Sequence, residues 1–225
     1  MQASTLLPDP GETNLSEAAG VREFRLPKFL AGDIILFAGR GDVSDLVSRW
    51  IERSPGEAPT YAVHTAQFLD PDRYLELDIV VKIRANPEIL RKRQAHDGWQ
   101  QRGFEVWRCR QLMPEQREAL TSEALAYLGE TFGAAKFLTH FLDGIASKLA
   151  RKEVFFFRRL NHDQRYPICS WITAFSYDRA LHYRFGVPPE CADPDQIDDW
   201  VSSHPDDWVR VFRLEDYIHG VGAQD

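Results

Sequence analysis

The order of strand-like and helix-like segments along the chain constrains its fold more than any other feature. Apolar and alternating runs, typical of strands, come first, and amphipathic patterns, typical of helices, dominate later. This order predicts the α+β class, with a small antiparallel sheet packed on helices. The predicted strands are 34–37, 61–69, 74–83, 103–109 and 208–212, and the predicted helices are 42–51, 114–129, 136–152, 169–183 and 194–203.

The length of 225 residues is typical of one domain that carries an insertion. We expect the domain to cover 24–215, with a helical insertion at 134–165. Residues 1–23 are polar and contain helix-breaking prolines and glycines, so they are a predicted mobile tail. Residues 216–225 are the predicted C-terminal tail.

Composition limits the compartment and the partners. The formal charge of −7, from 34 acidic and 27 basic residues, disfavours nucleic acid as a partner of the whole surface. Three widely spaced cysteines fit a reducing compartment better than a disulfide framework. The N-terminus lacks the basic start and apolar stretch of a signal peptide, so we expect a cytoplasmic protein and leave signal-independent export open. No run approaches the roughly 20 apolar residues that cross a bilayer.

Cys169 is the candidate nucleophile. It follows Pro167 and Ile168 and begins the predicted helix 169–183, where the positive end of the helix dipole favours a thiolate. Its backbone N–H, at the same helix end, is suited to stabilising an oxyanion. The alternative is that Cys169 is simply a small buried apolar residue, as free cysteines often are.

His64 and Glu76 are the candidate partners of this thiol. His64 lies within the predicted strand 61–69, where an imidazole is either a general base or a core residue. Glu76 lies on the next predicted strand and is expected to face His64 across a hairpin, where its carboxylate would fix the imidazole tautomer. Asp78 is the reserve for that role. A solvent-facing position on the strand remains the alternative for Glu76.

Seven short segments, in order along 30–212, resemble the permuted NlpC-type papain-like proteins, in particular their YiiX-like branch. The chain differs from that pattern at Trp171, where glutamate is usual, and at Ile168, where an aromatic residue is common. The matching segments are LAGDIILF at 30–37, the helix at 43–51, YAVH at 61–64, LELDIVVKI at 75–83, LGETFG at 128–133, ICSWI at 168–172 and DPDQI at 193–197.

This resemblance implies a circularly permuted papain-like fold, in which the histidine and acid strands precede the cysteine helix. It implies a triad of Cys169, His64 and Glu76 that acts without a cofactor. Further candidates for oxyanion or substrate contacts are Ser170 after the nucleophile, Tyr166 with a ring near it, and Asp33 in the first matching segment.

The insertion has two interpretations. Phe137, Phe141, Ile145 and Leu149 recur every four residues, which most simply predicts a core-facing stripe. The alternative is a lid or an acyl-accepting wall, whose basic flank at Arg158 and Arg159 would touch an acidic membrane surface.

Metal binding is not expected. His140 and His162 lie near Asp143 and Asp163 in the sequence, but their spacing matches no HExxH-type motif. Cys109 and Cys191 are expected to be structural or surface residues rather than reactive ones.

Three functions remain open. The first is an amidase or peptidase that cleaves a peptide, an isopeptide or a peptidoglycan stem, as the wider NlpC-type superfamily implies. The second is a lipid-directed thioesterase or acyltransferase, because the permuted branch also resembles lecithin-retinol acyltransferase-like proteins and the insertion is rich in phenylalanine. The third is a non-catalytic binding module on the same fold. The oligomeric state is open.

Overall fold

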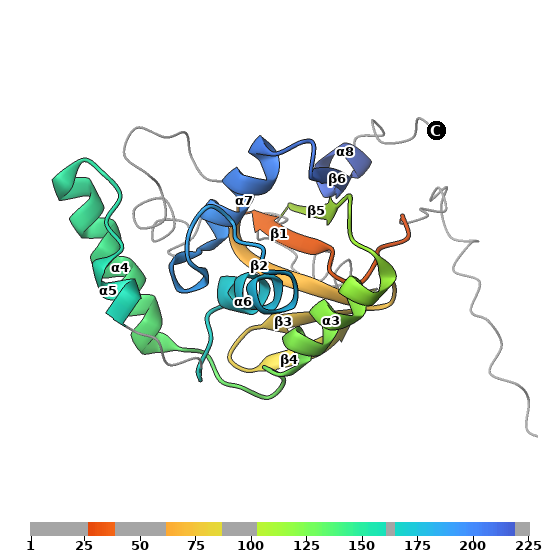
Figure 1. Ribbon diagram of the computed structural model, residues 1–225, viewed down its shortest axis with the longest axis horizontal. Helices are drawn as coiled ribbons and strands as arrows, with labels where there is room; N and C mark the ends of the chain where they lie inside the picture. Colours follow the sequence, from red (N-terminus) through yellow and green to blue (C-terminus); the bar gives the residue numbers. More distant parts are fainter. Residues whose placement is uncertain (1–26, 39–61, 87–102, 161–164, 219–225) are drawn as a thin grey trace, which may run out of the picture.

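The computed structural model describes residues 27–38, 62–86, 103–160 and 165–218 (Figure 1). The predicted helix 42–51 and the predicted tail 1–23 lie outside these ranges, as do Tyr61, His162 and Asp163. Among the described residues, no helix combines the length and the apolar character that crossing a bilayer requires.

The described residues form one antiparallel sheet of six strands in the order β4-β3-β2-β1-β5-β6. β1 lies in the middle and pairs with β2 on one side, where Phe37 is opposite His64, and with β5 on the other. The strands are β1 (Ile34–Ala38), β2 (Ala62–Asp70), β3 (Arg73–Leu77), β4 (Val81–Ala85), β5 (Phe104–Cys109) and β6 (Trp208–Arg213).

Alternate residues of β1 face opposite sides of the sheet, and both sides are covered. Ile34 and Leu36 pack in one apolar cluster with Tyr177 and Ile197, which belong to α6 (Cys169–Leu181) and α7 (Pro194–Ser203). On the other side the cluster is largely aromatic and comprises Phe29, Ile35, Phe37, Ala66, Phe68, Tyr74, Phe104, Val106, Phe212 and Leu214. A sheet packed against helices confirms the predicted α+β class.

The predicted strand 74–83 is wrong as a single element. It is divided into β3 and β4, which pair with each other in a hairpin. The residues between them leave the ladder because a neighbouring segment takes their backbone hydrogen bonds: Val80 bridges to Thr131, and the N–H of Phe132 donates to the carbonyl of Ile79. Local pattern could not reveal this partner, which lies fifty residues further along the chain.

The helices begin and end close to their predicted positions. α3 (Pro114–Leu125) starts with proline, as expected, but stops four residues early, in turns that lead to Gly129. α7 begins after Asp193, whose carboxylate accepts a hydrogen bond from the N–H of Gln196 and so caps the helix. α8 (Leu214–Ile218) extends three residues into the predicted C-terminal tail.

The insertion contains α4 (Ala134–Ala150) and the short α5 (Phe156–Leu160), which lie together at one side of the molecule (Figure 1). The predicted core-facing stripe is wrong where its side chains are described, because Phe141, Ile145 and Leu149 are exposed. The buried side chains of α4 are polar instead, and the contacts of two of them, Lys136 and Asp143, are described below. The side chain of Phe137 lies outside the described part.

Candidate active site

The nucleophile candidate is the first residue of a helix that lacks a side-chain cap. Cys169 begins α6, and the preceding residue, Ile168, makes no capping hydrogen bond. The first N–H groups of a helix have no partner within the helix, and the helix dipole makes this end positive. α6 packs against β2, so the sulfur is held near the strand that carries His64. The sequence predicted this helix start to the residue.

His64 meets Cys169 as the sequence predicted. The two side chains are hydrogen-bonded, although they come from β2 and from a helix that begins a hundred positions later. The imidazole Nε2 lies 3.7 Å from Glu76 Oε1. His64 and Cys169 are each only partly buried, so this pair is accessible to solvent.

Electrostatics favour a thiolate–imidazolium pair. Burial alone would lower the pKa of His64, but the charge and hydrogen bond of Cys169, followed by the nearby Glu76 carboxylate, raise this pKa to about 9. Burial alone would raise the pKa of Cys169, but His64 and the backbone N–H groups of Thr65 and Ser170 lower it overall. The two shifts move in opposite directions, and both favour the proton on the imidazole over the proton on the sulfur.

Glu76 is next to His64, and the two side chains face each other diagonally across the hairpin. In the β2–β3 ladder Glu76 pairs with Ala66, which places its carboxylate diagonally across from His64. The separation of 3.7 Å is that of an ion pair rather than a hydrogen bond. Asp78, the reserve candidate, lies beyond the end of β3, and its carboxylate accepts a hydrogen bond of 2.5 Å from Arg84.

Arg84 is a site residue that the sequence analysis missed. From β4 its Nε lies 3.4 Å from Glu76 Oε2, so the arginine bridges Glu76 and Asp78. A guanidinium in this place attracts the Glu76 carboxylate and limits its rotation. The only sequence signal was an arginine with strand spacing from a carboxylate, which is too common to be selective.

Ser170 and Tyr166 were predicted to contact the oxyanion or the substrate, and the structure places both side chains in other surroundings. The Ser170 hydroxyl is buried and donates to the carbonyl of Ala192 at 2.9 Å, so only its backbone N–H serves the sulfur. Tyr166 has a φ of 61° and a largely exposed ring. The structure therefore brings Ser170 to the site through its backbone and leaves the Tyr166 ring in solvent.

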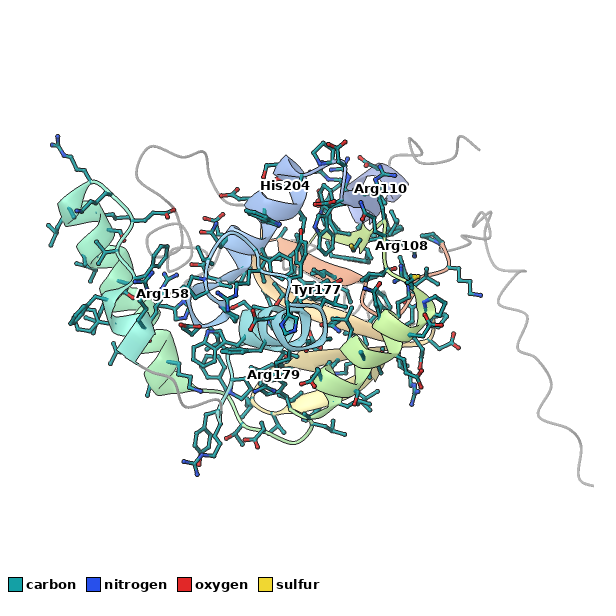
Figure 2. All side chains as sticks on the ribbon, in the orientation of Figure 1. Arg108, Arg110, Arg158, Tyr177, Arg179 and His204 are labelled. Atoms are coloured by element: carbon teal, nitrogen blue, oxygen red, sulfur yellow. The ribbon has the colours of Figure 1, made fainter. Side chains whose placement is uncertain are left out.

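The prediction for Asp33 as an oxyanion or substrate contact is wrong. Asp33 is fully buried, and its carboxylate binds Arg108 at 2.6 Å and the backbone N–H of Leu30 at 2.8 Å. Figure 2 labels Arg108, which reaches this position from β5. Asp33 precedes β1 and lies four residues from Phe37, the residue opposite His64, so it stabilises the start of the strand rather than the site.

The loop before Cys169 is held by Gly133, which precedes α4, and by the first turn of that helix. The N–H of Gly133 donates to the carbonyl of Pro167 at 3.0 Å, and the Lys136 ammonium donates to the carbonyl of Arg165. Gly133 is required here, because a Cβ at this position would lie 2.0 Å from the carbonyl oxygen of Tyr166. The start of the insertion is thus hydrogen-bonded to the loop that leads to the nucleophile.

The other thiols differ from Cys169. Burial raises the pKa of Cys109, and burial followed by the charge of Glu190 raises the pKa of Cys191 to about 11. Both side chains are buried. Within the described ranges, no three His, Cys, Asp or Glu side chains come together as metal ligands would.

Comparison with known proteins gives a partial structural likeness and no match in sequence. No protein-family model matches the chain, and no curated protein matches it. Among solved structures, it is similar to the metalloprotein yiiX from Escherichia coli O157:H7, at 19% sequence identity and a TM-score of 0.43, over 71% of each chain. This likeness assigns no chemistry to the chain.

Proposed function

We propose that the chain is a cysteine hydrolase that cleaves an amide bond through a thioacyl intermediate. The observation that carries this proposal is the Cys169–His64 pair at an uncapped helix N-terminus, because it combines an activated nucleophile, a base and backbone donors. The order of histidine before cysteine supports a permuted papain-like classification, in line with the sequence resemblance. A peptide, an isopeptide or a peptidoglycan stem is the proposed substrate class.

The proposed reaction has two halves. The Cys169 thiolate attacks the carbonyl carbon, and the backbone N–H of Cys169 stabilises the oxyanion. When the C–N bond breaks, the His64 imidazolium protonates the leaving amine and a thioester remains on the sulfur. His64 then takes a proton from water, whose oxygen attacks the thioester, and the product acid leaves as the thiolate forms again. Glu76 and Arg84 keep the imidazole oriented throughout.

Thiol reactivity tests the proposal without a known substrate. At pH 6.5, iodoacetamide should alkylate Cys169 well before Cys109 or Cys191, with peptide mass spectrometry as the readout. His64→Ala should slow alkylation of Cys169 by at least about tenfold, since the charge that lowers the pKa of this thiol is lost. Equal labelling of the three cysteines would favour a non-catalytic module.

Turnover on peptidoglycan stem peptides or isopeptides then tests the reaction itself. Cys169→Ala should abolish it with little change in folding stability, and His64→Ala should cost nearly as much. Glu76→Ala should cost less. Damage from Cys109→Ala equal to that from Cys169→Ala would contradict the assignment.

A lipid-directed thioesterase or acyltransferase is the second candidate. The observation that favours it is the exposed apolar side of α4, whose first residues adjoin the loop before Cys169. Incubation of the protein with acyl esters and with stem peptides, followed by mass spectrometry of the Cys169 peptide, separates the two candidates. A fatty acyl adduct on the sulfur favours the lipid reaction, and a peptidyl adduct favours amide cleavage.

A further inference from the structure

Helix α4 has its polar and apolar sides reversed relative to an ordinary surface helix. Its side chains at Lys136, His140, Asp143 and Ser147 follow one side, and the first three are buried. The opposite side is apolar and exposed, with Leu149 at 83% exposure and Leu138 at 55%. This apolar stripe consists of Leu138, Phe141, Leu142, Ile145 and Leu149, spaced as one face of a helix.

The inward polar side is anchored, so the orientation of the helix is fixed. The Lys136 ammonium lies over the Trp171 ring at 4.3 Å. Asp143 accepts hydrogen bonds from the N–H groups of Phe157 and Arg158 at 2.9 and 2.8 Å. Ser147 accepts from the N–H of Val154 at 2.9 Å. Rotation of α4 to bury its apolar stripe would break all of these contacts, so the stripe is a permanent surface.

Charge is segregated onto the same part of the chain. Residues 134–160, which we call the α4–α5 lobe, contain six basic and two acidic residues, a formal charge of +4, while the whole chain carries −7; the remainder therefore carries −11. Arg158 is not available to a partner, because it is buried against Asp193 at 2.7 Å and points from α5 toward the body of the molecule (Figure 2). The exposed cations of the lobe are Arg151, Lys152 and Arg159.

We propose that the α4–α5 lobe is a docking surface for an anionic lipid bilayer. A helix with an exposed apolar stripe and cations at its end has the composition of an interfacial helix, which buries its apolar side among acyl chains and leaves the cations at the headgroups. The acidic remainder of the chain is repelled by the same surface, so only the lobe can face it. Exposed Phe156 on α5 adds a bulky apolar side chain beside α4.

A bilayer suits this surface better than a protein partner does. The lobe lies at one side of the molecule (Figure 1), and its stripe runs along a single convex helix. A fluid, flat apolar layer accepts such a ridge without a matching groove. Docking would also bring the base of α4, and with it the loop before Cys169, to the membrane. The proposal does not depend on what Cys169 does.

Vesicle flotation of the full chain carrying Cys169→Ala tests the docking apart from any reaction. We expect binding to phosphatidylcholine vesicles that contain phosphatidylglycerol, and little binding to phosphatidylcholine alone. Lys152→Gln should weaken binding about fivefold, the effect of one cation near an anionic surface. Leu149→Asp should weaken it at least about tenfold, because a charge replaces an apolar side chain that would enter the bilayer.

Matched controls are exposed residues outside the lobe. Ile79→Asp, at a position 78% exposed, and Lys28→Gln should leave binding unchanged. All four variants should keep the thermal unfolding midpoint, since none of the side chains is buried. The proposal is overturned if the anionic vesicles are not bound, if the controls weaken binding as much as the lobe variants, or if Leu149→Asp instead dissociates a dimer in sedimentation.

Discussion

At the scale of single residues, the state of His64 decides whether this site can react. Its imidazole lies between a thiol and a carboxylate, and both partners stabilise its charged form against the cost of burial. Cys169 contributes the larger part, and Glu76, held by Arg84, contributes the smaller part. The charge on one side chain therefore depends on the protonation of another, as in other coupled pairs.

The histidine ring can be titrated directly by NMR. The His64 signal should titrate near pH 9. Cys169→Ala should lower the pKa of His64 by more than Glu76→Gln does, because the thiolate is the larger of the two influences that raise it. An unchanged His64 pKa in Cys169→Ala would show that no ion pair forms.

At the scale of elements, the connections of the insertion matter more than its helices. Among the contacts that join it to the body are the backbone contact of Gly133 with the loop before Cys169 and the buried network in which Arg158 joins Asp143 to Asp193. The first positions the nucleophile loop, and the second fastens α5 to the start of α7.

Substitution of Gly133 tests the first connection. Gly133→Ala should force the loop 165–168 to move, because the new methyl group would overlap the carbonyl oxygen of Tyr166, and alkylation of Cys169 should slow. Gly129→Ala is the matched control: it has open space around it but a φ of 87°, so it should cost about 1 kcal/mol of stability without affecting the thiol. Equal alkylation rates in both variants would remove Gly133 from this role.

Two arginines with ion pairs of similar length test the second connection. Arg158→Met leaves two buried carboxylates without their cation and should lower the free energy of unfolding by about 3–5 kcal/mol. Arg184→Met breaks an exposed ion pair with Asp178 of 2.6 Å, which solvent screens, and should change the free energy of unfolding far less. Urea denaturation measures both. Similar losses would mean that burial does not distinguish the two pairs.

At the scale of the whole molecule, the sheet brings together parts of the chain that are distant in sequence. α7 is joined to the sheet through Asp198, which accepts a hydrogen bond from the N–H of Ala62 at the start of β2. Burial, followed by the charge of Glu105, raises the pKa of Asp198 to about 7, while Arg213 and Arg210 oppose this shift. A carboxyl group with a raised pKa is therefore hydrogen-bonded to the strand that carries His64.

This carboxylate should make the stability of the protein depend on pH. Since the pKa of Asp198 is higher in the folded than in the unfolded state, the folded state binds more protons between pH 4 and 7, and its stability falls as pH rises through that range. Asp198→Asn keeps an acceptor for Ala62 and should reduce this fall, by on the order of 2 kcal/mol given partial solvent exposure. Urea denaturation from pH 4 to 8 measures it. In the exposed control Asp206→Asn, the free energy of unfolding should change with pH as it does in the wild type. The same dependence on pH in Asp198→Asn would contradict the assignment.

The sequence by itself determined the local elements and the chemistry available to them. Periodicity, a proline at the first turn of α3 and an Asp cap on α7 are local signals, so they fixed the helix starts and the α+β class. The residue types at positions 64, 76 and 169 likewise indicated a base, an acid and a thiol, in that order, before any geometry was known. The tertiary structure decided which of these groups meet and which surfaces remain exposed. It divided β3 from β4 through a segment fifty residues away, moved Asp33 into a buried pair with Arg108, added Arg84 behind Glu76 and turned the apolar side of α4 outward. Each of these outcomes depends on a partner that is remote in sequence. Hydrophobic periodicity predicts that a helix has an apolar side, but it does not indicate what packs against that side.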